Sequence, residues 1–263
     1  MHTDPRPYRR RTSVFLLVAG LVLVAGCNPS GSPSLVAHLR TSAAPPVAVT
    51  TTYAHMPTRS HVADRRVEQA FPAFRSSVSS IDAGLRQRMR WSWRPGCPVP
   101  LKKLRYVKVS FVGFGGRARQ GEMVVHRAVT SDVVDVMHRL YRHRFPIHRM
   151  HLVDDYRGDD GKSMSADNSS AFNCRKSTGS PGTWSQHSYG RAIDINPVEN
   201  PYVSPSGQVQ PREGARYADR SLHARGMIGP RSTVVRKFAS IGWSWGGAWS
   251  SAKDYQHFSQ NGR

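Results

Sequence analysis

The stretch SQHSYGRAID, residues 185–194, places a histidine and an aspartate seven residues apart, at His187 and Asp194. Gly190 between them allows close approach of the backbone without a steric penalty. We expect a strand to follow the glycine, and Ala192 and Asp194 would then share one face of it. The small alanine leaves room beside the aspartate for an ion and a substrate. Histidine nitrogen and carboxylate oxygen bind zinc at about 2.0–2.2 Å, so the stretch predicts part of a zinc site.

A second segment, DYQHF at residues 254–258, offers a third ligand, His257, and a nearby carboxylate, Asp254. On a regular strand these two residues, three apart, would face opposite ways. The upstream pair Gly246 and Gly247 argues against a helix, which would place them on one face. We therefore expect Asp254 to lie at a bend before a strand that carries His257.

The two motifs occur in the order Ser-x-His-x-x-Gly-x-Ala-x-Asp, then an acid three residues before a histidine. This arrangement resembles the zinc D-Ala-D-Ala peptidase family, which includes VanX- and VanY-type enzymes and phage L-alanyl-D-glutamate endopeptidases. The resemblance extends from about Cys97 to the C-terminus and implies the fold that this family shares with the hedgehog signalling domain. The stretches at residues 167–175 and 243–247 also look like exported actinobacterial members.

The resemblance implies three ligands for one Zn²⁺: His187, Asp194 and His257. Asp254 matches the catalytic residue that moves a proton from water to the leaving amine. Arg175 matches an arginine that stabilises the carbonyl oxygen, and Ser185 would hydrogen-bond the substrate. Alternatives remain open: Arg175 in a surface salt bridge, with Arg157 in its place, and Ser185 as a turn residue. VanX and VanY types carry Glu where this chain has Asp254, which favours the endopeptidase branch.

The N-terminal segment has the pattern of an export signal. Basic residues 9–11 precede an apolar run at 14–25, which is shorter than the roughly 20 residues of a membrane-spanning helix. The run ends in LVAGC, residues 23–27, which resembles a bacterial lipobox with Cys27 as the lipidated residue; an ordinary cleaved signal peptide is the alternative. We predict a signal peptide at 1–26, and a chain anchored by lipid to the outer face of the cell membrane.

Composition divides the rest of the chain. Residues 27–65 are rich in Pro, Ser, Thr and Ala, which is typical of a flexible tether. Residues 66–263 form the predicted zinc metallopeptidase domain. Three cysteines in 263 residues exclude a disulfide-dense mini-protein. With Cys27 lipidated, Cys97 and Cys174 form an even pair in an oxidising compartment, which predicts a disulfide; two free thiols are the alternative.

The formal charge of +21 would suit nucleic-acid binding, but an exported chain excludes that partner. Removing residues 1–26, which carry four Arg and one Asp, leaves 237 residues with a charge of +18. The remaining charge fits attraction to anionic wall polymers. Arg outnumbers Lys 31 to 7, so a GC-rich genome explains the charge equally well.

The hydrophobic pattern predicts an α+β fold, in which helices surround a small antiparallel sheet. Expected helices cover residues 76–91, a segment starting at the N-cap 130–132, and 232–240. Expected strands cover 104–114, 123–129, 150–153 and 192–196, with a closing hairpin at 243–258 and a functional loop at 154–183.

Together these features predict a monomeric zinc peptidase that cleaves peptidoglycan stem peptides, at L-Ala-D-Glu or D-Ala-D-Ala bonds. Two other functions compete with it: a non-catalytic, zinc-stabilised wall-binding module, and an adhesin that binds polyanions through its basic surface.

Overall fold

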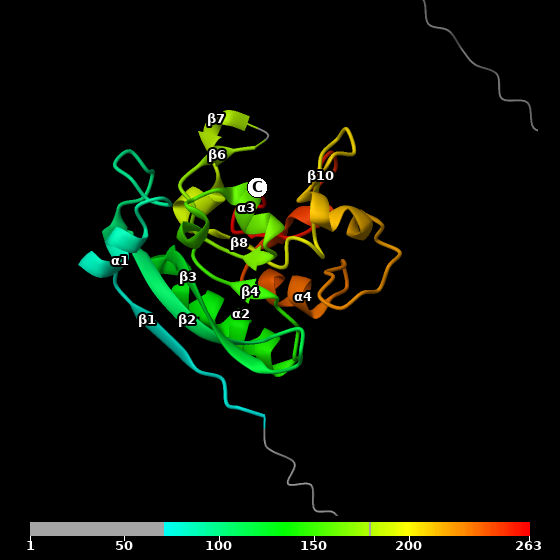
Figure 1. The fold of residues 1–263 in the computed structure, drawn as a ribbon, viewed down its shortest axis with the longest axis horizontal. Helices are drawn as coiled ribbons and strands as arrows, with labels where there is room; N and C mark the ends of the chain where they lie inside the picture. The colour runs from blue at the N-terminus through cyan, green and yellow to red at the C-terminus, as the bar shows by residue number, and fades with distance from the viewer. Residues whose placement is uncertain (1–70, 179) are drawn as a thin grey trace, which may run out of the picture. The chain divides into compact units, whose positions relative to one another are not determined.

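The computed structural model describes residues 71–178 and 180–263, whose arrangement is shown in Figure 1. The predicted signal peptide, Cys27, the whole predicted tether at 27–65 and residues 66–70 of the predicted domain lie outside the described residues. Helices and small, mostly antiparallel sheets follow one another without a regular alternation, which confirms the α+β class. Several small sheets replace the single one expected. In the described part, no helix has the length and apolar character needed to cross a bilayer.

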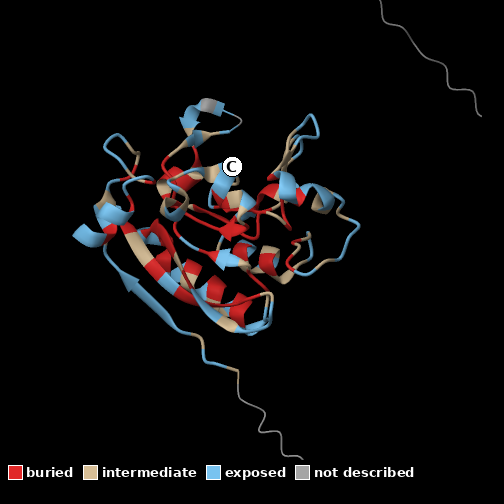
Figure 2. Ribbon diagram, viewed as in Figure 1, coloured by how far each residue is buried: buried red, intermediate tan, exposed pale blue. Residues whose placement is uncertain are grey.

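The longest strands form an antiparallel sheet of order β1-β2-β3 that packs on helix α2 (Figure 1). Its elements are β1 Ser76–Ser79, β2 Leu104–Val112, β3 Ala118–His126 and α2 Thr130–Arg142. The core between β2 and α2 contains alternate residues of the strand and residues three or four apart on the helix, the periodicities expected of a strand and a helix that each bury one face. These residues are Val107, Val109 and Phe111 of β2 and Val133, Met137 and Leu140 of α2. Figure 2 shows this buried layer below the exposed upper hairpins.

The predicted helix at 76–91 is wrong over its first half. Residues Ser76–Ser79 form the edge strand β1, paired with β2 from Ser76 opposite Val109 to Ser79 opposite Tyr106. The helix α1 is only Ala83–Arg88, because Asp82 caps it: its side chain accepts a hydrogen bond of 2.8 Å from the N–H of Leu85. The apolar residues from Val78 onward have helical spacing, but they belong partly to a strand and partly to a helix, so the spacing did not indicate a single helix.

The other predicted elements are present with shifted ends. The return strand begins at Ala118 rather than 123, because polar residues continue the ladder with β2 on its exposed half. Helix α2 begins at Thr130, but residues 130–132 do not cap it. The imidazole of His126 instead accepts from the N–H of Ala128 in a preceding 3₁₀ turn, η2 Arg127–Val129.

Two further three-stranded sheets, with orders β11-β13-β8 and β10-β9-β12, carry Asp194, Asp254 and His257. The strands are β8 Ala192–Asp194, β9 Tyr202–Val203, β10 Val209–Gln210, β11 Ser244–Trp245, β12 Lys253–Asp254 and β13 His257–Ser259. The predicted closing hairpin is present as β11 paired with β13, but η6 Gly246–Ala248 and β12 lie between them. Helix α4, Thr233–Ala239, starts after Ser232 as expected and buries Phe238 against this sheet.

The segment predicted as loop, residues 154–183, contains several short elements. They are helix α3 Asp160–Ser165, the end of η3 Val153–Tyr156, and strands β5 Asn168–Ser169, β6 Lys176–Ser177 and β7 Ser180–Trp184. Strand β5 pairs in parallel with β4, Arg149–Met150, which is shorter than the strand expected at 150–153. Short elements of this kind lack a sustained hydrophobic period, so the sequence pattern does not reveal them.

A disulfide links Cys97 to Cys174, with the two Cα atoms 5.9 Å apart. Cys174 is buried in a second apolar cluster with Leu104, Val124 and Phe172. The bond joins Cys97, which lies shortly before the 3₁₀ turn η1 (Leu101–Lys103), to the residue directly before Arg175. It therefore fixes the start of the segment that leads into the hairpin β6–β7.

A buried carboxyl pair joins the loop after β8, which carries Glu199, to Asp167, the residue before β5. Glu199 and Asp167 are 7% and 5% exposed, and Oε2 of Glu199 has no hydrogen-bond partner. Burial raises the pKa of Glu199 to about 8, and the neighbouring Asp167 charge adds to the effect while Arg216 opposes it. Asp167 Oδ1 accepts from the N–H of Val198 at 3.0 Å, which holds this loop beside β5. Glu199 is therefore protonated in the folded protein at neutral pH.

This pair predicts a pH-dependent stability that the change Glu199→Gln removes. The folded-state pKa lies above the unfolded value, so the contribution is present below pH of about 4.5 and is lost as the pH rises towards about 8. In urea unfolding between pH 5 and 8.5, the Gln variant should gain stability relative to the parent as the pH increases.

The matched control is Glu213→Gln, which alters an exposed glutamate in η5, Arg212–Ala218. Its stability difference from the parent should stay constant over the same range. A constant difference for Glu199→Gln as well would contradict the raised pKa of Glu199.

Candidate metal centre and cleft

A cleft of about 680 Å³ opens above the sheet β11-β13-β8. Helix α3 and the hairpin β6–β7 contribute to its lining, as do Tyr202 and Gln210 of the strands β9 and β10. In Figure 1 the hairpin β6–β7 and the β10 hairpin project on either side of α3. His187, Asp194 and His257 lie in this cleft.

Strand register brings two of these residues face to face. Strand β13 pairs with β8 so that His257 lies directly opposite Asp194. Side chains in such cross-strand positions point to the same face and come into contact. His187 arrives from the 3₁₀ turn η4, Gln186–Tyr189, which ends at Gly190 with φ of +64°. A Cβ at Gly190 would lie 2.6 Å from the backbone nitrogen of His126, so the glycine permits the close packing of η4 on β3.

The three side chains converge on one point. His187 Nε2 lies 3.2 Å from His257 Nδ1 and 3.2 Å from Asp194 Oδ2, and His257 Nδ1 lies 3.0 Å from Asp194 Oδ1. All three residues are buried. A tetrahedral zinc ion with bonds of about 2.0–2.1 Å separates its ligand atoms by about 3.3 Å. The spacing of the three donor atoms therefore fits this ion.

Hydrogen bonds on the far side of each imidazole fix which nitrogen faces the cluster. His187 Nδ1 donates to the carbonyl of Ala171, and His257 Nε2 donates to the carbonyl of Arg263 at 3.0 Å. Because a carbonyl only accepts, the proton of each neutral ring lies on that outer nitrogen, and the inner nitrogen presents its lone pair. Outer hydrogen bonds to carbonyl groups are typical of histidines that bind metals.

The electrostatics agree with a cation at this point. Burial alone would raise the pKa of Asp194, but His187 and His257 hold it well below its ordinary value. Burial would lower the pKa of His257, yet the hydrogen bond and charge of Asp194 raise it to about 8. Both shifts show that positive charge is favoured beside Asp194, and this set of donors is what zinc prefers.

Asp254 lies near the cluster in strand β12, opposite Tyr202 of β9. The expected bend is present, but it follows Asp254 at residues 255–256, where the chain passes from one sheet to the other. Burial raises the pKa of Asp254 to about 6, and its Oδ1 is shielded from solvent without a hydrogen-bond partner. Gly246 lies behind it: a Cβ there would approach Asp254 Cβ to 2.9 Å and His257 Cβ to 3.3 Å.

Arg175 and Ser185 also line the cleft. Nη2 of Arg175 forms an ion pair of 2.8 Å with Asp160 Oδ2, so Arg175 does form a salt bridge, the alternative left open above, with a partner that the sequence did not identify. The hydroxyl of Ser185 accepts from the N–H of His187 at 3.3 Å, which is the role of a turn residue. Arg157, the alternative to Arg175, does not line the cleft.

Three cleft residues escaped the sequence patterns. Asp160 is the first residue of α3, and nothing in its local sequence distinguishes it from Asp159. Gln256 is 2% exposed and leaves its Oε1 unpartnered; its place between Asp254 and His257 was the available signal. The ring of Trp249 lies 5.6 Å from that of His257, whereas the other two tryptophans of that region, Trp243 and Trp245, are buried in the core.

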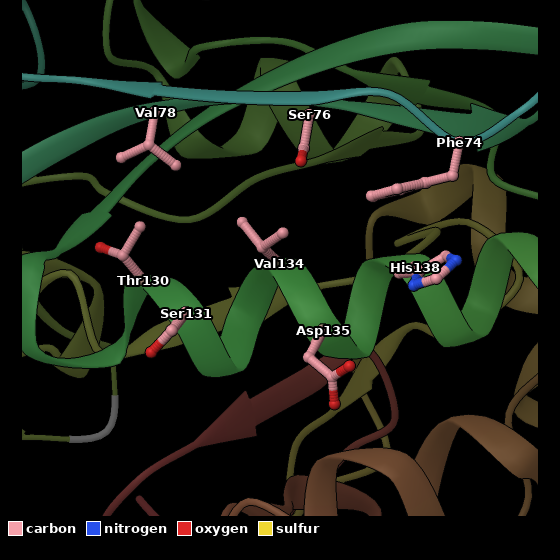
Figure 3. Close-up of a pocket in the computed structure, with 8 residues that line it drawn as sticks. All are labelled: Phe74, Ser76, Val78, Thr130, Ser131, Val134, Asp135 and His138. Atoms are coloured by element: carbon pink, nitrogen blue, oxygen red, sulfur yellow. The ribbon is translucent and has the colours of Figure 1, made fainter.

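A second concave region, a groove of about 550 Å³ between β1 and α2, contains no comparable chemistry (Figure 3). Its histidine, His138, stacks on Phe74 with ring centres 4.7 Å apart, and Asp135 pairs with Arg139 at 2.8 Å. These groups are satisfied by structural contacts.

A second group of possible ligands, Glu122, His151 and Asp155, is an ion-pair network. Glu122 already accepts two hydrogen bonds from Arg88, of 2.6 and 3.0 Å, and one from the hydroxyl of Tyr106. Its carboxylate therefore has little capacity left for a metal ion.

Residues 178–260 match the model of the D-alanyl-D-alanine carboxypeptidase family. The match covers about a third of the chain and includes the three clustered ligands, Asp254 and Ser185, but not Arg175. It supports kinship with zinc D-Ala-D-Ala peptidases and a peptidase role on cell-wall peptides. No curated protein and no solved structure matches the chain.

The contact behind Asp254 predicts a strong effect of Gly246→Ala. The added methyl group must displace the backbone and side chain of Asp254, and overpacking of this kind costs about 1–3 kcal/mol of stability. We expect a lower unfolding midpoint in urea and altered NMR signals of the His257 ring.

Gly115→Ala is the matched control, because no atom lies within 4 Å of the added Cβ at that turn. It should leave both observables unchanged. An unchanged His257 signal in Gly246→Ala would show that the close packing at Gly246 does not position the site.

Proposed function

We propose that the protein is a zinc peptidase that hydrolyses stem peptides of peptidoglycan. The observation that carries this proposal is the convergence of three buried donor atoms, 3.0–3.2 Å apart, in a cleft that also contains an unpartnered carboxylate. The family match supplies the substrate class. The bonds under consideration are L-Ala-D-Glu and D-Ala-D-Ala, and the fold kinship with the hedgehog domain belongs to the same proposal.

His187, Asp194 and His257 would hold the ion, and their outer hydrogen bonds keep both imidazoles oriented. Zinc bound there supplies Lewis-acid activation of water and of a peptide carbonyl. Asp254 takes a proton onto its carboxylate from the attacking water and delivers it to the nitrogen of the leaving amine. Burial raises the pKa of Asp254, which makes its carboxylate a better proton acceptor than an exposed one.

Arg175 and Ser185 would act on the substrate. Arg175 lines the cleft and its side chain is 26% exposed, so its guanidinium could donate to a carbonyl oxygen of the substrate. The Ser185 hydroxyl accepts one hydrogen bond from His187 N–H and can still donate one to a peptide carbonyl. Both residues are fixed by the backbone around η4, so they are oriented before a substrate binds.

Export and anchoring are part of the proposal. Basic residues 9–11, the apolar run 14–25 and the small residues before Cys27 support a lipid anchor on the outer face of the cell membrane. There the positive charge of the chain would favour contact with anionic wall polymers.

The metal assignment predicts one equivalent of zinc for the purified protein. His257→Ala should weaken zinc binding by more than the 10–100-fold typical of losing an outer hydrogen-bond partner. Native mass spectrometry and competition with a chromophoric chelator measure both quantities.

His151→Ala is the matched control, because His151 belongs to the ion-pair network around Glu122. It should leave the stoichiometry at one. Unchanged zinc affinity in His257→Ala would refute the assignment of the cluster.

The catalytic assignment predicts that Asp254→Asn abolishes hydrolysis and retains zinc. We expect the release of soluble fragments from purified wall to fall by at least about 100-fold, the lower range for a positioned acid–base group. Mass spectrometry of the digested muropeptides identifies the bond, by loss of a terminal D-Ala or by cleavage after L-Ala.

Asp219→Asn changes an exposed aspartate that bonds only to Ser221 and serves as the control. A parent protein that binds wall and zinc but releases nothing would support the binding-module alternative. Wall binding that collapses with salt and survives chelation would support the adhesin.

A further inference from the structure

An ion pair forms part of the cleft lining. Nη2 of Arg175 lies 2.8 Å from Oδ2 of Asp160, and their side chains are 26% and 25% exposed. Both residues line the cleft that contains the three ligands and Asp254. Because the two side chains are partly buried, solvent screens their charges only in part, and because they are partly exposed, a substrate in the cleft can contact them.

The backbone around Arg175 is fixed against the turn that carries His187. The N–H of Arg175 donates to Ser188 Oγ at 2.9 Å, and its carbonyl accepts from Ser188 Oγ at 2.7 Å and from the N–H of Ser185 at 3.1 Å. The preceding residue, Cys174, is held by the disulfide. The backbone of Arg175 is therefore tied to the turn that carries His187, and its guanidinium lines the same cleft.

Asp160 is held with similar definition from the other side. It is the first residue of α3, and the side chain of Asp159 caps that helix by accepting from the N–H of Lys162 at 3.0 Å. The amide of Asn173 lies 3.4 Å from Asp160 Oδ1. The acid therefore does not reach Arg175 by chance rotation of a surface side chain.

Because of this ion pair, the described cleft lining outside the ligand cluster contains no half-buried positive charge that lacks an acidic partner. The basic residues among the described cleft lining are Arg175 and Arg263. Arg175 is neutralised by Asp160, and Arg263 is exposed, so that solvent and salt screen its charge.

We propose that Asp160 is a specificity-determining residue: through its ion pair with Arg175, it makes the cleft favour peptides in which the residue after the scissile bond carries no free α-carboxylate. The inference rests on the proposed peptidase function. A carboxylate at that position would have to displace Asp160 from Arg175 or share one guanidinium with it, and two like charges at such a distance repel. A carboxamide or a continuing peptide chain carries no charge at that position and meets no such repulsion.

Matched substrates test this proposal independently of which bond is cleaved. One pair is acyl-L-Lys-D-Ala-D-Ala with a C-terminal carboxylate or carboxamide. The other is L-Ala-γ-D-Glu-L-Lys with the α-carboxyl group of D-Glu free or amidated. The quantity measured is the ratio of kcat/KM for the amide to that for the acid, in the full-length, zinc-loaded protein.

We expect the parent to favour the amide by about threefold or more, and Asp160→Asn to shift the ratio towards the acid by about tenfold, since one unit of negative charge is removed beside Arg175. The control is Asp159→Asn, which makes the same change of charge one residue away. Asp159 pairs with Lys162 rather than with Arg175, so its ratio should equal that of the parent.

A parent that favours the acid, or an Asp160→Asn ratio equal to that of Asp159→Asn, would overturn the proposal. A shift that appears with Arg263→Gln instead would assign the selectivity to the other basic residue and also overturn it. Asp160→Ser provides a second neutral variant if the Asn protein does not fold.

A parent that cleaves none of the four peptides would contradict the proposed function. The selectivity is then decided by isothermal titration calorimetry of the same pairs. Tighter binding of the amides that is lost in Asp160→Asn supports the role of Asp160, and equal binding refutes it.

Discussion

Asp194 carries its negative charge in the protein interior because two imidazole rings face it, one across a strand pair and one from a turn. The strand pair determines this contact: His257 lies opposite Asp194, and a slip of one residue would turn every side chain of β13 to the other face. Two glycines allow the other residues of the site to pack around this strand pair. Gly190 lets the turn with His187 pack on β3, and Gly246 lets Asp254 and His257 pack closely against the turn η6.

The features that could be predicted from the sequence are those set by short spacings. His187, Gly190 and Asp194 lie within one turn and one strand, where chain geometry allows few arrangements. The structure brings His187 and Asp194 together with His257. The mixed fold class follows from the hydrophobic pattern for the same reason. The first half of the helix at 76–91 could not be predicted, because Val78 fits helical spacing while its neighbours complete the edge of a sheet formed with β2, 28 residues later.

Contacts between distant residues explain most of what the sequence left out. Asp160 and Arg175 are 15 residues apart, and their pairing depends on α3, on the turn η4 and on a disulfide to Cys97. No local pattern encodes such a contact. The same holds for Gln256, whose burial follows from its position between two sheets, and for Glu199, whose raised pKa follows from the folding of its loop onto Asp167.

The ligand cluster and the Asp160–Arg175 pair differ in how closely they are tied to the matched family. The residues that converge on the metal position all lie within 178–260, the part that the family model describes, whereas Asp160 and Arg175 precede it. The match therefore speaks for the chemistry at the ligand cluster more strongly than for the groups that meet the substrate beside it. An arginine whose charge is neutralised by Asp160 attracts a terminal carboxylate only weakly. The ligand cluster alone therefore does not imply a preference for substrates that end in a free carboxylate. Under the proposed function, the choice of bond would then depend on side chains such as Asp160, which lie in the cleft but outside the ligand cluster.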